Sequence, residues 1–117
     1  MNTGPLIESA LAGMTYSGVV VPIAHLKYSG TAKTYLRYYN YLDQDEYYAD
    51  DEPQSNGKND TIDIFSDKRD ALYALKTEIK TRLREADFTI GTAGPEMYED
   101  DNQMYHLPIN VYHESEV

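Results

Sequence analysis

The 117-residue chain contains no cysteine and no tryptophan, and it has only two phenylalanines. The absence of cysteine excludes disulfides, thiolate nucleophiles, iron–sulfur clusters and zinc sites built on cysteine. Basic residues are also scarce, because 10 Lys and Arg stand against 20 Asp and Glu, which gives a formal net charge of -10. General nucleic-acid binders and proteins that bind anionic membranes need a basic field, so this balance argues against both classes.

Long apolar runs are missing as well. The longest, Val19 to Leu26, is far shorter than the roughly 20 residues that a membrane helix needs, and Pro22 and His25 interrupt it. The first residues lack the basic and apolar stretches of a secretion signal. We therefore expect no membrane partner.

Tyrosine, in contrast, is abundant, with 12 residues. Alternation over the strand predicted for Thr34 to Leu42 places two substantial sets of side chains on opposite faces. One face carries Tyr35, Arg37, Tyr39 and Tyr41, and the other carries Leu36, Tyr38, Asn40 and Leu42. Two interpretations remain open for this strand and the following Tyr47 and Tyr48: packing of amphipathic side chains in the core and at the edge, or a protein–protein surface.

The acidic residues gather in two regions. We predict a polar and mobile loop over residues 43–60, because such long loops in compact domains are functional or disordered. Six of its acidic residues crowd together: Asp43, Asp45, Glu46, Asp50, Asp51 and Glu52. Residues 96–102 form a second acidic turn region.

The other segments predict two helices and several strands. Helical spacing of apolar residues indicates a helix of about ten residues near the N-terminus, with Thr3 able to cap it, and a longer helix from about Ser66 to Ala86. The apolar stripe of the long helix is Leu72, Leu75, Ile79 and Leu83. Strands are predicted at 19–24, where Pro22 indicates an edge, and at 61–65, 88–90 and 104–113. The fold class is α+β: a single domain, residues 1–117, with a small, mostly antiparallel sheet and one long and one short helix packed on one face.

The sequence contains no complete motif for catalysis or metal binding. His106 and His113 are an odd number of positions apart, so a regular strand directs them to opposite faces, where they cannot share an ion. A calcium loop beginning at Asp43 would need Gly and Glu where the chain has Tyr48 and Gln54. The acids lie in polar segments rather than in dry pockets, and no phosphate loop or nucleophile elbow is present. We predict no enzyme, no catalytic residues, no cofactor and no metal.

The order of these segments resembles that of the small tail-completion (tail-terminator) proteins of long-tailed bacteriophages, often labelled minor capsid or head–tail joining proteins. The resemblance extends over nearly the whole chain, and order and spacing carry it rather than any single motif. The matching stretches are Val21-Pro22-Ile23-Ala24, then Tyr28-Ser29-Gly30 leading into Thr34-Tyr35-Leu36-Arg37-Tyr38, then Thr61-Ile62-Asp63-Ile64-Phe65-Ser66-Asp67, and last Phe88 and Met104-Tyr105-His106-Leu107-Pro108-Ile109.

This resemblance implies a structural virion protein without enzymatic activity or cofactor. It implies a hexameric ring that caps the head-proximal end of the tail tube, stops tube growth and joins the tube to the neck of the filled capsid. The implied partners are further copies of the chain, the tail tube protein and a head-completion or stopper protein, while DNA passes through without specific binding. The implied location is the virion at the head–tail junction, and the host cytoplasm before assembly.

The residues suit such a ring. A net charge of -10 on each subunit repels phosphate, so DNA would not adhere to the ring. We hypothesise that Tyr35, Arg37, Tyr39, Tyr41, Tyr47 and Tyr48 form the subunit or partner interface. We also hypothesise that Asp43, Asp45, Glu46, Asp50, Asp51 and Glu52 line the lumen or dock onto a neighbour.

Two alternatives remain open. One is an acidic inhibitor that mimics DNA and blocks a nucleic-acid-binding protein, against which the basic helix end at Lys80, Arg82 and Arg84 argues. The other is the neighbouring head-closure (stopper) protein of the neck, which differs in its place in the assembly and not in its chemistry.

Overall fold

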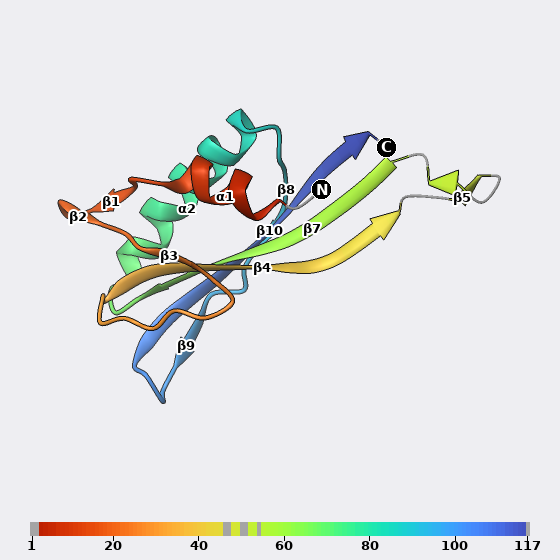
Figure 1. Cartoon of the computed structure of the whole chain (residues 1–117). Helices are drawn as coiled ribbons and strands as arrows, with labels where there is room; N and C mark the ends of the chain where they lie inside the picture. The colour runs from red at the N-terminus through yellow and green to blue at the C-terminus, as the bar shows by residue number, and fades with distance from the viewer. Residues whose placement is uncertain (1–2, 46–47, 50–51, 54, 117) are drawn as a thin grey trace.

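Three long antiparallel strands form the middle of a computed structural model of the chain (Figure 1). The structure describes the backbone of residues 3–45, 48–49, 52–53 and 55–116, and the side chains of residues 3–40 and 59–113. The long strands are β4 (Thr34–Asp45), β7 (Ser55–Ser66) and β10 (Met104–Glu116), in the order β4–β7–β10. Shorter strands cover the two edges: β3 (Ile23–His25) runs parallel to β4, and β8 (Thr89–Ala93) and β9 (Met97–Glu99) run antiparallel to β10.

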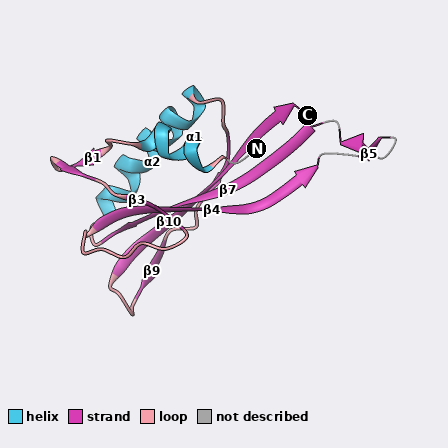
Figure 2. Cartoon of the chain, in the orientation of Figure 1, coloured by secondary structure: helices cyan, strands magenta, loops and turns pink. Residues whose placement is uncertain are grey.

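Two helices, α1 (Gly4–Leu11) and α2 (Arg69–Glu85), lie together on one face of this sheet (Figure 2). The apolar stripe predicted for the long helix is confirmed, because all four of its residues are almost completely buried against the sheet. Opposite them, buried residues of the three long strands meet in one row, Leu36–Ile64–Leu107. The fold is therefore α+β, with a long and a short helix on one face of a mostly antiparallel sheet.

Two small hairpins complete the described chain. β1 (Thr15–Tyr16) pairs with β2 (Val19–Val20), and β5 (Tyr48–Ala49) pairs with β6 (Glu52–Pro53). Ser17 and Gly18, which join β1 to β2, both have positive φ angles of 54° and 79°. This backbone matches the twist of a two-residue hairpin, and glycine adopts it without steric cost.

Pro108 lies inside β10, where a proline would ordinarily remove a ladder hydrogen bond. Its carbonyl accepts a hydrogen bond of 2.8 Å from the Gly94 backbone N–H, at the break between β8 and β9. In an antiparallel strand the nitrogen and the carbonyl of one residue point to the same side. The nitrogen of Pro108 therefore faces the break in the edge strand, and the sheet loses no ladder bond there.

Some predicted boundaries are wrong. β4 continues to Asp45 and β7 begins at Ser55, so the loop predicted over residues 43–60 is too long at both ends. Pairing with neighbouring strands outweighs the low strand propensity of the Asp, Asn and Gly residues there. β9 lies within the region predicted as an acidic turn, and α2 begins after Lys68, with the Ser66 hydroxyl accepting the Lys68 N–H at 3.0 Å.

Beyond the short edge strands, the three long strands continue away from the helices (Figure 1). Among the described strands, β3 pairs with β4 only at Leu36–Tyr38, and β8 pairs with β10 as far as Tyr112. The backbone of residues 43–45, 55–58 and 113–116 remains paired across the three strands, with both Asp43 and His113 opposite Lys58. We call these residues the distal ribbon.

Polar side chains attach α1 to the buried face of the sheet. The Thr3 hydroxyl precedes the helix but makes no capping bond; it donates instead to the buried Asp60 carboxylate at 2.6 Å. The Tyr38 hydroxyl donates to the Glu8 carboxylate. Burial, and after it the hydrogen bond to Glu8, raise the pKa of Tyr38 well above its usual value of 10.

Replacing Tyr38 by Phe should give a pH-dependent loss of stability. At neutral pH the variant should lose about 1 kcal/mol, the usual net contribution of a hydrogen bond. Because the pKa is raised on folding, the contribution of Tyr38 is complete below about pH 10, the unfolded-state value, and falls as the pH rises above it towards the folded-state value. Urea unfolding of both proteins between pH 7 and pH 11 tests this, and stability curves that stay parallel over the range would contradict it.

Candidate interaction surfaces

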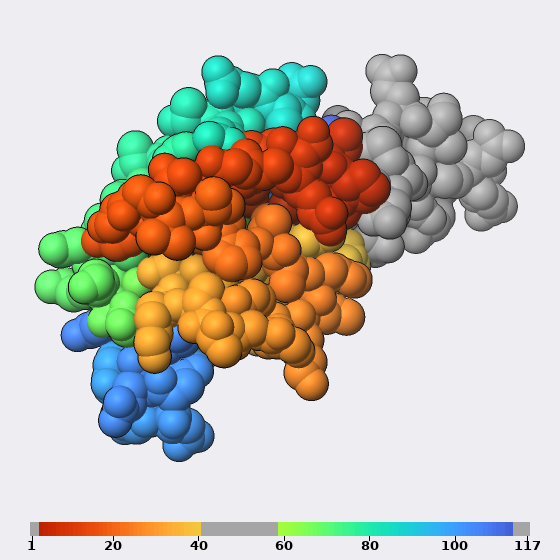
Figure 3. All heavy atoms as spheres, turned by 60° about the vertical axis from the view of Figure 1, so that its left-hand side comes forward, coloured from red at the N-terminus to blue at the C-terminus, as the bar shows by residue number. Residues whose placement is uncertain are grey.

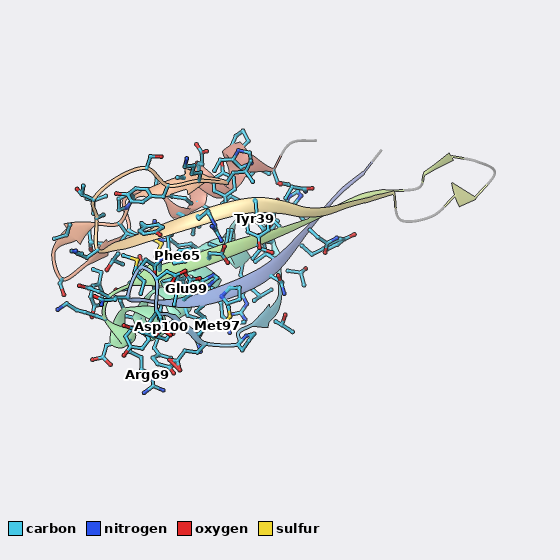
Figure 4. The ribbon with its side chains drawn as sticks, turned by 90° about the horizontal axis from the view of Figure 1, so that it is seen from below. Tyr39, Phe65, Arg69, Met97, Glu99 and Asp100 are labelled. Atoms are coloured by element: carbon cyan, nitrogen blue, oxygen red, sulfur yellow. The ribbon has the colours of Figure 1, made fainter. Side chains whose placement is uncertain are left out.

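An aromatic stack crosses the face of the sheet that is turned away from the helices, which Figure 4 shows from below. Tyr35, Phe65 and His106 are neighbours across β4, β7 and β10, and Tyr28 stacks on Tyr35 from the loop before β4. Successive ring centroids are 4.2, 4.9 and 4.3 Å apart, with interplanar angles of 20°, 17° and 9°. Four near-parallel rings thus join three strands and one loop.

A buried carboxylate lies beside this stack. Asp63, whose side chain is 1% exposed, accepts hydrogen bonds at Oδ2 from Arg37 Nε (3.0 Å) and Nη2 (2.5 Å). Its Oδ1 lies 2.9 Å from His106 Nε2, at ion-pair distance but without hydrogen-bond alignment. On the other side of the ring, His106 Nδ1 lies 3.3 Å from Glu99 Oε2. We call Tyr28, Tyr35, Arg37, Asp63, Phe65, Glu99 and His106 the outer-face cluster.

The geometry of this cluster favours a structural role over catalysis. A carboxylate can orient a histidine for proton transfer, but that histidine must reach a substrate with its other nitrogen. Here both ring nitrogens of His106 lie against carboxylates, and the residue is 8% exposed. Among the residues that the structure describes, no group of three or more His, Asp or Glu is arranged to hold a metal ion.

The two histidines of β10 lie on opposite faces, as their spacing predicts. His106 stacks on Phe65 in the outer-face cluster, while His113 packs against the buried Phe88, with centroids 4.9 Å apart. The two side chains therefore do not form a joint site.

The residues predicted as an interface divide into two groups. Tyr35, Arg37 and Tyr39 are half-buried on the outer face, where Tyr35 stacks between Tyr28 and Phe65 and Arg37 pairs with Asp63. Burial raises the pKa of Tyr35, as expected for a phenol used in packing. These contacts support the packing interpretation for Tyr35 and Arg37, while the protein–protein surface stays a prediction.

The remaining residues predicted for the interface or the lumen lie outside the part of the chain whose side chains the structure describes. Only the backbone is described for Tyr41, Asp43, Asp45, Tyr48 and Glu52, and Glu46, Tyr47, Asp50 and Asp51 lie outside the described residues. Their roles as an interface or a lumen lining stay predictions.

Sequence reasoning missed Asp63, Phe65, Glu99 and His106 as partners of Arg37 and Tyr35. The available signal was the alternation in each strand, which puts Asp63 and Phe65 on the polar face of β7. Their pairing with Arg37 and Tyr35 requires the register of β4 against β7, which the alternation alone does not supply.

A second surface lies where β4 begins and β7 ends. There the β1–β2 hairpin borders a groove of about 420 Å³. Figure 3 shows the orange hairpin beside the yellow-orange start of β4 and the green residues that precede α2. Val19 and Val20 of this hairpin are 67% and 61% exposed. The lining residues are Tyr16, Ser17, Val19, Val20, Val21, Ala32, Lys33, Thr34, Asp67 and Lys68.

Comparisons with known proteins do not assign the chain to a family. No family model matches the chain, and no curated protein matches it at a significant level. Within the described residues, neither helix is both long and apolar enough to cross a membrane.

Proposed function

We propose that this protein is a structural virion protein that forms a ring on the head-proximal end of a phage tail tube and joins the tube to the capsid neck. The resemblance in segment order motivates this proposal. The observation that carries it is the distal ribbon, a three-stranded extension whose outer strands run beyond β3 and β8.

Strand edges of this kind favour association with another chain. An edge strand presents backbone N–H and C=O groups that a further strand can pair with, and native proteins keep such edges short or covered unless they are used. In the distal ribbon, the described edge strands β3 and β8 cover neither β4 at residues 43–45 nor β10 at residues 113–116. A neighbouring subunit that pairs there would complete the sheet, and head-to-tail repetition of that contact closes a ring.

The charge of the chain supports the same assembly. A closed ring of subunits, each with a net charge of -10, has a strongly acidic field. Such a field repels the phosphates of DNA that passes through the opening. The partners under this proposal are further copies of the chain, the tail tube protein and the head-completion protein, at the head–tail junction of the virion.

Loss of the protein from the phage that encodes it should give tails of uncontrolled length, or tails that do not join heads. A ring that ends tube growth and forms the neck contact is then absent, so both steps fail. An amber codon at Lys33, grown in suppressing and non-suppressing hosts, isolates the effect, and electron microscopy of the lysates measures tail length and head attachment.

The control is restoration of joined particles by the wild-type chain supplied from a plasmid. Normal, joined particles without the protein would overturn the proposal. Tails of normal length beside heads that leak DNA would overturn it in favour of a stopper protein. Intact virions together with the loss of inhibition of a host nuclease would overturn it in favour of a DNA mimic.

A further inference from the structure

We propose that the groove beside the β1–β2 hairpin receives the acidic segment, residues 43–52, of a second copy of this chain. The inference deepens the proposed function and rests on it in one respect, since it adds a second contact between neighbouring subunits of the ring to the strand pairing at the distal ribbon. Three observations support it: the apolar groove, the charge of the segment, and the placement of the two at opposite ends of the paired strands β4 and β7.

The groove offers apolar surface that the described residues of the chain leave uncovered. Val19 and Val20 form the two-residue strand β2 and are more than half exposed, whereas the adjacent Val21 is buried. An isolated two-stranded hairpin is marginally stable in water, so a partner that packs against the valines would also stabilise the hairpin. The two adjacent valines beside the groove thus give a second chain apolar surface to pack against.

The rim of the groove has the opposite charge to most of the chain. Lys33 and Lys68 border it together with Asp67, and all three side chains are exposed. Within the described part of the chain, neither lysine ammonium group forms an ion pair. The groove thus combines apolar walls with two available cations on a protein of net charge -10.

The acidic segment has the complementary chemistry. Its sequence combines closely spaced carboxylates with Tyr47 and Tyr48, whose rings supply apolar contact area with a polar tip. Carboxylates suit the lysines of the rim, and tyrosine suits the valines of the wall. A nucleic acid is a poor alternative occupant, because the net charge of the whole chain repels it.

The segment cannot reach the groove of its own chain. β4 and β7 each contain 12 residues; the groove lies where β4 begins and β7 ends, and the segment joins the opposite ends of the same strands. At about 3.3 Å per residue, the two sites are roughly 40 Å apart. Only another copy can therefore bring its segment into the groove. Because the two contacting surfaces differ, the contact is head-to-tail, and it closes into a ring or extends into a fibre.

The absence of cysteine allows a clean test. One variant carries Val20→Cys in the groove wall, and a second carries Tyr48→Cys in the segment. Mixed under mild oxidation, the two variants should form a disulfide-linked dimer, while either variant alone should not. The matched control pairs Val20→Cys with Arg84→Cys, which places the second thiol at an exposed position of α2, and it should give no dimer.

Charge reversal tests the recognition itself. Lys33→Glu with Lys68→Glu, or Asp50→Lys with Asp51→Lys, should each weaken self-association at least about tenfold, and all four changes in one chain should restore it. Sedimentation velocity measures the dissociation constant, and circular dichroism confirms that each variant is folded. Failure of the mixed pair to cross-link, both in concentrated solution and in isolated tails, would overturn the inference.

The two proposals fail in different ways. If the protein proves necessary for tail length and head joining but no cross-link forms, the groove contact is wrong and the proposed function stands. If the cross-link and the charge rescue are found while particles assemble normally without the protein, the contact stands and the proposed function is wrong.

Discussion

Replacing Asp63 by Ala should lower the free energy of unfolding by about 3 kcal/mol, because it removes the shared partner of two groups from different strands. Arg37 would lose both of its hydrogen bonds to Oδ2, and His106 would lose the carboxylate beside Nε2. The cost falls at the lower end of the range for buried ion pairs, since the Arg37 side chain is 31% exposed and water can solvate it in part. Urea unfolding at pH 7 measures the change.

Glu78→Ala supplies the matched control. Glu78 also pairs with an arginine, Arg82, at 2.9 Å, but its side chain is 41% exposed, against 1% for Asp63, and the pair lies on one helix. Such surface pairs contribute about 0.5 kcal/mol or less. Equal losses for the two variants would show that the Asp63 contact is as weak as a surface pair, and the structural role given to the outer-face cluster would be wrong.

Replacing Ile64 by Ala should cost about 3–4 kcal/mol, which is a large part of the 5–15 kcal/mol that stabilises a typical domain. Ile64 lies near the C-terminal end of the central strand β7, opposite Leu36 on one side and Leu107 on the other, and all three are buried. Well-ordered strands on both sides limit how far the surroundings can collapse into the space that the side chain leaves. Thermal unfolding, with a decrease of well over 10 °C in Tm, should report the loss.

Two further variants calibrate that result. Ile64→Val removes one methyl group and should cost about 1 kcal/mol, while Val19→Ala alters an exposed side chain and should change stability by less than about 0.5 kcal/mol. A loss for Ile64→Ala no larger than that for Val19→Ala would contradict the placement of β7 at the centre of the core.

The fold class and the long helix could be predicted because their signals are local. The spacing of Leu72, Leu75, Ile79 and Leu83 defines one helix face without reference to the rest of the chain. The alternation in β10 likewise identifies the buried residues Leu107, Ile109 and Val111. Helical period and strand alternation depend on neighbours in sequence, so composition and order suffice to find them.

The missed features depend on pairing between distant residues. β9 is three residues long and takes its strand conformation from the first residues of β10, so nothing within residues 97–99 indicates it. The ends of β4 and β7 extend through polar residues because each continues the ladder of the other. The outer-face cluster needs the same information, since Arg37 and Asp63 meet only when the register between their strands is known.

The groove was missed for a different reason. Its lining comes from three separate parts of the chain, within residues 16–21, 32–34 and 67–68, and the exposure of Val19 and Val20 is visible only in the folded protein. In sequence these valines belong to an apolar run that predicts a strand at the edge of the sheet. Composition identified the acidic segment, but it did not identify the surface with the complementary charge.

The outer-face cluster also selects one alignment of the sheet over its competitors. If β7 slipped by one residue against its neighbours, Asp63 would enter the apolar core; if it slipped by two, the carboxylate would face a tyrosine instead of Arg37. Both misalignments leave a buried charge without a partner, which costs several kcal/mol. Strands of 12 and 13 residues have many near-equivalent pairings, and a single aspartate between an arginine and a histidine makes the native one distinct. The cluster thereby destabilises misaligned sheets relative to the native one, and this role needs neither substrate nor partner.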